Sequence, residues 1–269
     1  MSVVIQSGFV GIDEDLTYPR IGWNNISGTV TSTGTDADGF PAANARTNVT
    51  YTAWQSTTAG QEWRNTFASA QSVAYVGVAV HNAGTLGATI TVRKLSGGTW
   101  SDWTGSPSAS PSNDDAILFL LSPESVDGIG IEVTGAAARI GVIRAGAIME
   151  WPRRAQWTGL PITESQQLRY NFNESETGNW LGRTVVSSGN QFEVNIDNLS
   201  ETYRTSAFAD FAAHANTGDG PFFIAPRPLD YPNEVAYAWP TETVRMSREI
   251  PNKLASGSVG LSLMGYRAP

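Results

Sequence analysis

The stretch QFEVNIDNLSETYRTSAFADFAAHANTGDGPFFIAPRPLDYPNEVAYAW, residues 191–239, decides the fold of this chain. Apolar and polar residues alternate over 191–197, which predicts a half-buried strand. From 199 to 214 the apolar residues recur at helical spacing along one stripe, which predicts the only convincing helix of the chain. Glycine and proline at 218–221 end that helix, and the apolar run 222–224 predicts a covered strand. The stretch therefore predicts an amphipathic helix laid on a β-sheet.

Short alternating runs continue on both sides of this stretch, and turn residues separate them at the spacing typical of β-sandwiches. A length of 269 residues suggests two domains. The predicted fold class is mainly β, with an N-terminal β-sandwich of jelly-roll type and a C-terminal β-sandwich or barrel that carries one packed α-helix. The predicted divisions are an N-terminal arm (1–19), a sandwich (20–149), a linker (150–161) and a second β domain (162–269) with its helix at 199–214.

Individual strands are predicted with different strength along the first domain. The run SVAYVGVAV at 72–80 is the strongest strand signal, whereas 61–70 is expected to form a turn or a weak helix. Separate strands are expected at 115–121 and 128–134. The apolar run 3–5 is expected to add to the edge of a sheet.

The composition excludes several classes of function. The net charge is −8 and the basic residues are not clustered, which argues against binding to nucleic acid. No apolar run approaches the ~20 residues that a membrane-spanning helix needs. The N-terminus lacks the basic and apolar regions of a secretory signal, so we expect none. The chain has no cysteine, which excludes disulfides and thiolate metal sites.

Groups that could perform chemistry are scattered, and we therefore predict no enzyme, no catalytic residue and no cofactor. No G-x-S-x-G motif is present, and His81 and His214 are expected to have structural roles. A glycoside hydrolase needs two carboxylates at a fixed separation, and nothing in the sequence places any two of its carboxylates in that way. The candidates are Glu62, Asp102, Asp114, Asp115 and Glu132. The Asp36-Ala37-Asp38-Gly39 run opens like a calcium loop but lacks the distal glutamate, so a solvated turn is favoured over a metal site.

Aromatic residues supply the candidate binding sites. Sugar rings stack on exposed aromatic faces while polar groups orient the hydroxyls, so the sugar-binding candidates are Trp23, Trp54, Trp63, Trp100 and Trp103. Trp100, Asp102 and Trp103 could supply both kinds of group and are the candidate glycan contacts; packing inside the protein is the alternative. Tryptophan and arginine are also frequent at protein interfaces, and a loop stiffened by prolines can form a protein contact. The candidate interface residues are Trp151, Arg153, Arg154, Trp157, Pro226, Pro228 and Tyr231.

Two resemblances are carried by particular motifs. The early strand ending at Trp54, followed by SVAYVGVAVHNAG, ITVRKLSGGTWSDW and AILFLL, resembles a discoidin-like or galactose-binding-like sandwich. The motifs GNWLGR, the strand–helix unit 191–214, and GPFF followed by PRPLDYPNEVAYAW resemble the ring-forming domain of distal tail and baseplate proteins of long-tailed bacteriophages and gene transfer agents. Many of those proteins have the ring domain first, whereas here it comes second.

The second resemblance implies a structural virion protein of a phage tail tip or baseplate. Such a protein multimerises into a hexameric or trimeric ring, contacts neighbouring tube and hub proteins, and presents the outer sandwich, with host-surface carbohydrate as a further expected partner. It is expected in the tail of the virion, after assembly in the bacterial host cytoplasm. The alternatives are a carbohydrate-binding module protein that recognises a host-surface glycan and a glycoside hydrolase with an unrecognised site.

Overall fold

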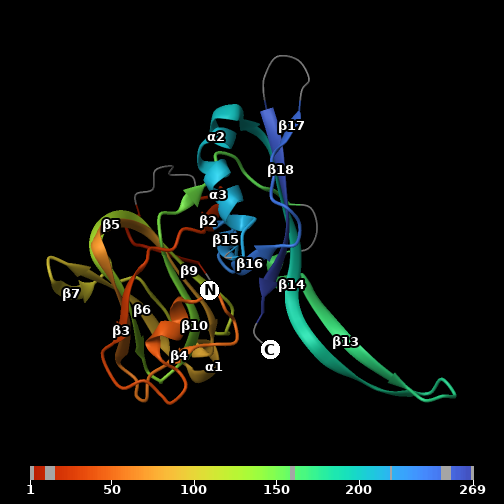
Figure 1. Cartoon of the computed structure of the whole chain (residues 1–269), viewed down its shortest axis with the longest axis horizontal. Helices are drawn as coiled ribbons and strands as arrows, with labels where there is room; N and C mark the ends of the chain where they lie inside the picture. Colours follow the sequence, from red (N-terminus) through yellow and green to blue (C-terminus); the bar gives the residue numbers. More distant parts are fainter. Residues whose placement is uncertain (1–2, 10–15, 158–160, 219, 250–255, 268–269) are drawn as a thin grey trace.

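The computed structural model describes residues 3–9, 16–157, 161–218, 220–249 and 256–267. In these residues the chain forms two nine-stranded sheets, which are antiparallel apart from one parallel pair, and a few short helices. Figure 1 shows a rounded body that contains the first sheet, a second body that contains the other sheet and the helices, and a long hairpin that leaves the second body. The predicted mainly-β fold class is confirmed.

The first sheet folds into the N-terminal sandwich because two very long strands bend through its corner. The first half of β5 pairs with β3 and with the end of β9, while its second half pairs with β10 and with the beginning of β9. The register shifts between Thr66 and Gln71, where the strand passes from one layer to the other. The strands of this sheet are β1 (Val3–Ile5), β3 (Gly28–Ser32), β4 (Trp54–Gln55), β5 (Gln61–His81), β6 (Thr89–Ser96), β7 (Thr99–Asp102), β8 (Ser108–Ala109), β9 (Ile117–Thr134) and β10 (Arg139–Gly146).

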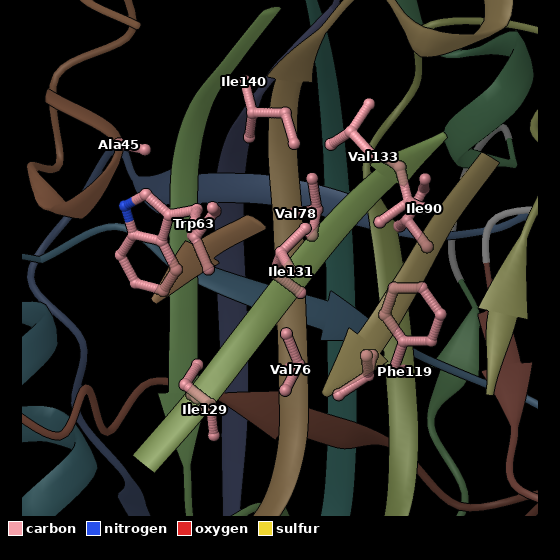
Figure 2. Close-up of a cluster of buried hydrophobic side chains, with 14 of the residues drawn as sticks. Ala45, Trp63, Val76, Val78, Ile90, Phe119, Ile129, Ile131, Val133 and Ile140 are labelled. Carbon is pink, nitrogen blue, oxygen red and sulfur yellow. The ribbon is translucent and has the colours of Figure 1, made fainter. Parts of the chain in front are cut away.

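Apolar side chains from both layers meet inside the sandwich. Figure 2 shows Trp63, Val78, Phe119 and Ile131 pointing into this common core from β5 and β9. Trp63 also donates its indole N–H to the carbonyl of Ala42, 2.8 Å away, so the ring is buried without an unpaired donor. Alternating residues of β5 and β9 therefore pack the two layers of the sandwich against each other.

Two expectations for this domain are wrong. Residues 61–70 are strand rather than turn or helix, because β3 and β9 pair with them from both sides. The two strands expected at 115–121 and 128–134 are the ends of one strand, β9. The expectation for residues 3–5 is confirmed, since β1 pairs in parallel with β9.

The second sheet collects strands from both ends of the chain. Its central order is β11-β2-β15-β16-β18-β14-β12. The strands β2 and β11, at the two ends of the range expected for the first domain, thus belong to this sheet. Its strands are β2 (Arg20–Gly22), β11 (Met149–Glu150), β12 (Gln156–Trp157), β13 (Gln166–Glu174), β14 (Trp180–Ser200), β15 (Phe222–Ala225), β16 (Ala236–Pro240), β17 (Ser247–Glu249) and β18 (Ser256–Tyr266).

The predicted helix over 199–214 is present but differs in two respects. Residues 199 and 200 still belong to β14, and the rest is broken at Ser206, whose φ of −113° and ψ of −107° are not helical. The Ser206 hydroxyl donates to the carbonyl of Thr202, a local bond that competes with the helical ladder. The helical elements are η1 (Ala42–Arg46), α1 (Ala83–Leu86), η2 (Ile162–Glu164), α2 (Glu201–Thr205) and α3 (Ala207–Ala215).

A third core joins the sandwich to the second sheet. It contains Tyr75 and Leu118 from the sandwich and Phe223 and Tyr237 from β15 and β16, all buried. Gly77 of β5 lies so close to Phe223 that a Cβ atom on Gly77 would come within 2.5 Å of the ring. The contact between the two bodies therefore depends on a residue without a side chain at position 77.

Replacing Gly77 with alanine is expected to lower the free energy of unfolding by about 1–3 kcal/mol, the usual cost of overpacking a closed core. Phe223 is fully buried, and its ring centroid lies 5.0 Å from that of Tyr237. Urea denaturation measures the change. The matched control is Gly218→Ala, because a Cβ atom at Gly218 meets no other atom, and this variant should change stability little. A glycine such as Gly98, whose φ is 78°, would not serve, because that backbone conformation itself favours glycine. Equal stability of wild type and the Gly77 variant would show that this joint is looser than described.

Candidate functional site

A hairpin that projects from the second sheet is the first candidate site. It comprises β13 and the first part of β14, residues 166–188, and we call it the projecting hairpin. β14 pairs with β18 only from Gly189 onward. Between 166 and 188 the two strands therefore pair only with each other among the residues that the structure describes, and both outer edges of the ribbon are open. Figure 1 shows its tip far from the sandwich and from the helices.

Large apolar side chains cover the projecting hairpin even though it has no core of its own. Aromatic rings follow one another along it, with ring centroids 6.0 Å apart for Tyr170 and Phe172 and 5.9 Å apart for Phe172 and Trp180. The guanidinium of Arg183 lies 4.1 Å from the centroid of the Tyr170 ring. More than half of the surface is exposed for Phe172, Trp180, Leu181, Val185 and Val186.

The tip of the projecting hairpin is a compact, hydrogen-bonded loop that carries acidic residues. The amide of Ser175 donates to the carbonyl of Asn179 over 2.9 Å, and the amide of Asn179 donates to the Ser175 hydroxyl over 3.0 Å. Glu174 and Glu176 are exposed beside it, and neither pairs with a basic side chain in the described part of the chain. The tip therefore presents negative charge on a loop whose conformation is already fixed.

The second candidate site is a cleft between the sandwich and α3, which we call the interdomain cleft. Its volume is about 750 Å³, within the range of ligand-binding pockets. The residues that line it come from the loop after β2, from the end of η1, from β10 and from the region around the end of α3. They are Trp23, Asn24, Asn25, Arg46, Thr47, Asn48, Val49, Arg144, His214, Gly218 and Pro221.

Buried tyrosines hold two walls of the interdomain cleft in place. The Tyr75 hydroxyl donates to the carbonyl of Asn24, and the Tyr237 hydroxyl donates to the carbonyl of Asn48 over 3.2 Å. Burial raises the pKa of both tyrosines above the usual value, although nearby Arg144 lowers the pKa of each in part. Both hydroxyls thus remain protonated donors at neutral pH, and the loops that they hold are fixed.

Arg144 gives the interdomain cleft its charge. Its side chain is almost fully buried; Nη1 donates to the carbonyl of Trp23 over 3.3 Å and Nη2 donates to the side-chain oxygen of Asn48. Its Nε has no hydrogen-bond partner, and no carboxylate pairs with the guanidinium among the described residues. Arg46 adds a second guanidinium, and none of the described residues that line the cleft is an aspartate or a glutamate. The cleft is therefore basic although the chain has a net charge of −8.

The predicted glycan contacts do not form an open platform. Trp103 is 1% exposed and lies in the sandwich core, so it cannot stack on a sugar; this prediction is wrong because the β7–β8 turn folds the ring inward. Trp100 is half-buried, and the guanidinium of Arg64 lies 4.6 Å from its ring centroid. Asp102 pairs with Arg93 at 2.5 Å. Both remaining residues thus already have cationic partners within the chain.

The predicted interface residues separate into two groups. Trp151, Pro226 and Pro228 are buried within the chain, so the prediction is wrong for these three. Trp151 packs against the aromatic rings of α2 and α3 instead. Arg153, Arg154 and Tyr231 are exposed. Trp157 pairs through its backbone with Val194, in β12 and β14.

The remaining polar candidates have structural partners. Asp36 accepts from the indole N–H of Trp54 and from the amide of Ala42, both over 2.9 Å, so its carboxylate fixes a turn. His81 is buried, with Nε2 2.7 Å from the carbonyl of Asp115, and burial lowers its pKa. The described residues contain no group of three or more His, Cys, Asp or Glu placed to hold a metal ion. None of the described helices is long and apolar enough to cross a membrane.

Sequence reasoning singled out Trp23 of the interdomain cleft as a sugar-binding candidate but missed the other residues that form the two candidate sites. Phe172 and Trp180 flank the polar, glycine-containing run NESETGN, which is a hairpin signal that was available in the sequence. Nothing in the sequence indicated that the outer edges of this hairpin are unpaired among the described strands. Arg46, Arg144 and His214 lie far apart along the chain, and only the tertiary fold brings them together.

No family model matches the chain, and no curated protein matches it. Among solved structures, a pectin-binding carbohydrate-binding module is 16% identical, with a TM-score of 0.40, and the match covers 46% of this chain and 93% of the module. A family 32 carbohydrate-binding module of C. perfringens NanJ in complex with galactose is 13% identical, with a TM-score of 0.39 and coverages of 45% and 93%. Truncated AlyQ, with CBM32 and alginate lyase domains, is 13% identical, with a TM-score of 0.38 and coverages of 67% and 49%. The function of this chain therefore has to be inferred from its own residues.

Proposed function

We propose that this protein is a structural subunit that assembles with further copies of itself through the projecting hairpin, as a ring at the tip of a phage-type tail. The observation that carries this proposal is the hairpin with two open edges and exposed aromatic rings. An isolated two-stranded ribbon is only marginally stable in water, and open apolar strands invite pairing with another chain. The hairpin becomes stable when a second molecule covers it.

The exposed apolar area agrees with a protein interface. The five side chains named above together expose on the order of 500 Å² if each is taken at the usual size of its type. A standard interface buries about 800 Å² on each partner. The hairpin of one copy thus supplies a large share of one such interface.

The geometry favours a head-to-tail contact. The hairpin projects away from its own body (Figure 1), which leaves it free to reach a different surface on the next copy. A contact between two different surfaces produces a ring when the rotation closes. The resemblance of the second half of the sequence to ring-forming tail proteins supports the same arrangement.

Light scattering after size-exclusion chromatography, together with negative-stain electron microscopy, tests the proposal on the full chain. The expected result is a closed ring of three or six copies. A monomer that persists at high protein concentration would contradict the proposal.

A second candidate function is recognition of a glycan by the interdomain cleft. The observation that favours it is Trp23, a half-buried ring that lines the cleft beside the side chains of Asn24 and Asn25. Aromatic faces and amide groups are the usual partners of sugar rings and their hydroxyls. This function requires no catalytic group and is compatible with a structural subunit.

If a saccharide binds in the cleft, it should quench the tryptophan fluorescence, and the Trp23→Phe variant should lose the effect. The Trp100→Phe variant is the control, because Trp100 lies on the sandwich under Arg64 and outside the cleft. Titration with galactose and with galacturonate oligomers measures the change. Fluorescence that stays constant with both sugars, or quenching that remains in the Trp23 variant, would remove this candidate.

A further inference from the structure

We infer that the acidic tip of the projecting hairpin docks into the basic interdomain cleft of the next copy. This inference rests on the proposed assembly through the hairpin and names the surface that receives it. The two surfaces differ in charge and belong to opposite parts of the molecule, as a head-to-tail contact requires.

Charge complementarity is the first argument. The tip carries Glu174 and Glu176, both exposed and without basic partners among the described residues. The lining of the cleft, in the part of the chain that the structure describes, contains Arg46 and Arg144 and no acidic residue. Since the whole chain is acidic, two copies repel each other on average, and a local acid–base match is needed to set which surfaces meet.

Arg144 provides the second argument. The Arg144 guanidinium is 2% exposed and pairs with no carboxylate of the described residues, so it is costly to bury, and its field acts through a medium of low dielectric constant. Its Nη atoms are held by the carbonyl of Trp23 and by Asn48, so the charge is fixed at the wall of the cleft. A carboxylate that enters the cleft would be attracted by this fixed positive charge, and the side chains that line the cleft would not have to rearrange.

Reach and rigidity provide the third argument. From Gln166 to Glu174 the hairpin extends by roughly 25–30 Å at the usual rise of a strand, which is enough to carry its tip across the boundary between two copies. The hydrogen bonds within Ser175–Asn179 fix the loop before it binds, so little conformational entropy is lost on docking. Figure 1 shows the tip of the hairpin far from β10 and α3, which carry the cleft residues Arg144 and His214, so the contact is between copies.

Charge reversal tests the inference. Glu176→Arg and Arg46→Glu should each weaken association of the full chain about tenfold or more, and the double variant should recover most of the loss because the pair is restored with opposite sign. The matched control is Glu242→Arg with Arg245→Glu, two exposed residues outside both surfaces, which should leave association unchanged. Single variants with unchanged association would overturn the inference.

Disulfide trapping keeps the test independent of how well the charge variants fold. Because the chain has no cysteine, Thr177→Cys at the tip together with Thr47→Cys in the cleft introduces the only two thiols. Mild oxidation should then produce a ladder of covalently linked copies on a non-reducing gel. Thr177→Cys paired with Ser101→Cys, which is exposed on β7, should give none. No ladder from the first pair, or equal ladders from both, would overturn the inference.

The outcomes separate this inference from the proposed function. If the wild type forms rings and these variants assemble normally, the hairpin docks elsewhere; the inference then fails while assembly stands. If the wild type is a monomer, both fail. If the Trp23→Phe variant loses a saccharide response while the tip variants assemble normally, the cleft is a sugar site and the inference is overturned.

Discussion

Replacing Phe172 and Trp180 together with serine is expected to convert the assembled protein into monomers. Both rings are more than half exposed in the single chain, and they meet edge to face on the projecting hairpin, with centroids 5.9 Å apart. Aromatic anchors of this kind commonly contribute about 2 kcal/mol or more each at an interface. Since about 1.4 kcal/mol corresponds to a tenfold change, the double variant should associate at least ~100-fold more weakly.

Sedimentation or light scattering over a range of concentrations measures this loss. The melting temperature of the monomer should not fall, because neither ring belongs to a core of the single chain. Tyr51→Ser is the control: Tyr51 is 88% exposed but lies in the loop before β4. A double variant that still forms rings would place the interface on another surface, and the proposed role of the hairpin would be wrong.

Replacing Phe211 with alanine should have the largest effect on stability. Phe211 of α3 is fully buried, and its ring lies 5.0 Å from that of Phe222 and 6.1 Å from that of Phe208. Removing such a ring leaves a cavity between helix and sheet, with an expected loss of about 3–5 kcal/mol. This is a large part of the stability of an ordinary domain.

Chemical denaturation measures the loss, and Ala209→Ser on the exposed side of α3 is the control, with an expected change of about 0.5 kcal/mol. A loss below about 1 kcal/mol for the Phe211 variant would show that the helix does not brace the sheet. The same variant should weaken any binding in the interdomain cleft, because His214, one turn further along α3, lines it.

Local patterns in the sequence were sufficient for most of the strands and for the position of the helix. Phe192, Val194 and Ile196 alternate in the sequence and are buried in the second sheet, because the strand period places them on one face. The apolar stripe did not reveal the break of the helix at Ser206. The hydroxyls of Thr205 and Ser206 donate hydrogen bonds to a nearby backbone carbonyl, and such bonds leave the spacing of the apolar residues unchanged.

What the sequence by itself determined is the mainly-β class, the apolar faces of the strands and the helical segment that covers the second sheet. These follow from side-chain period and turn chemistry, which act between neighbours in the chain. Tertiary structure alone decided that Trp103 faces inward, that no described strand pairs with the outer edges of the hairpin at 166–188, and that Arg46, Arg144 and His214 line one cleft. Burial, open edges and clustered charge depend on which segments lie beside each other, and that arrangement is set by packing between residues far apart in the sequence.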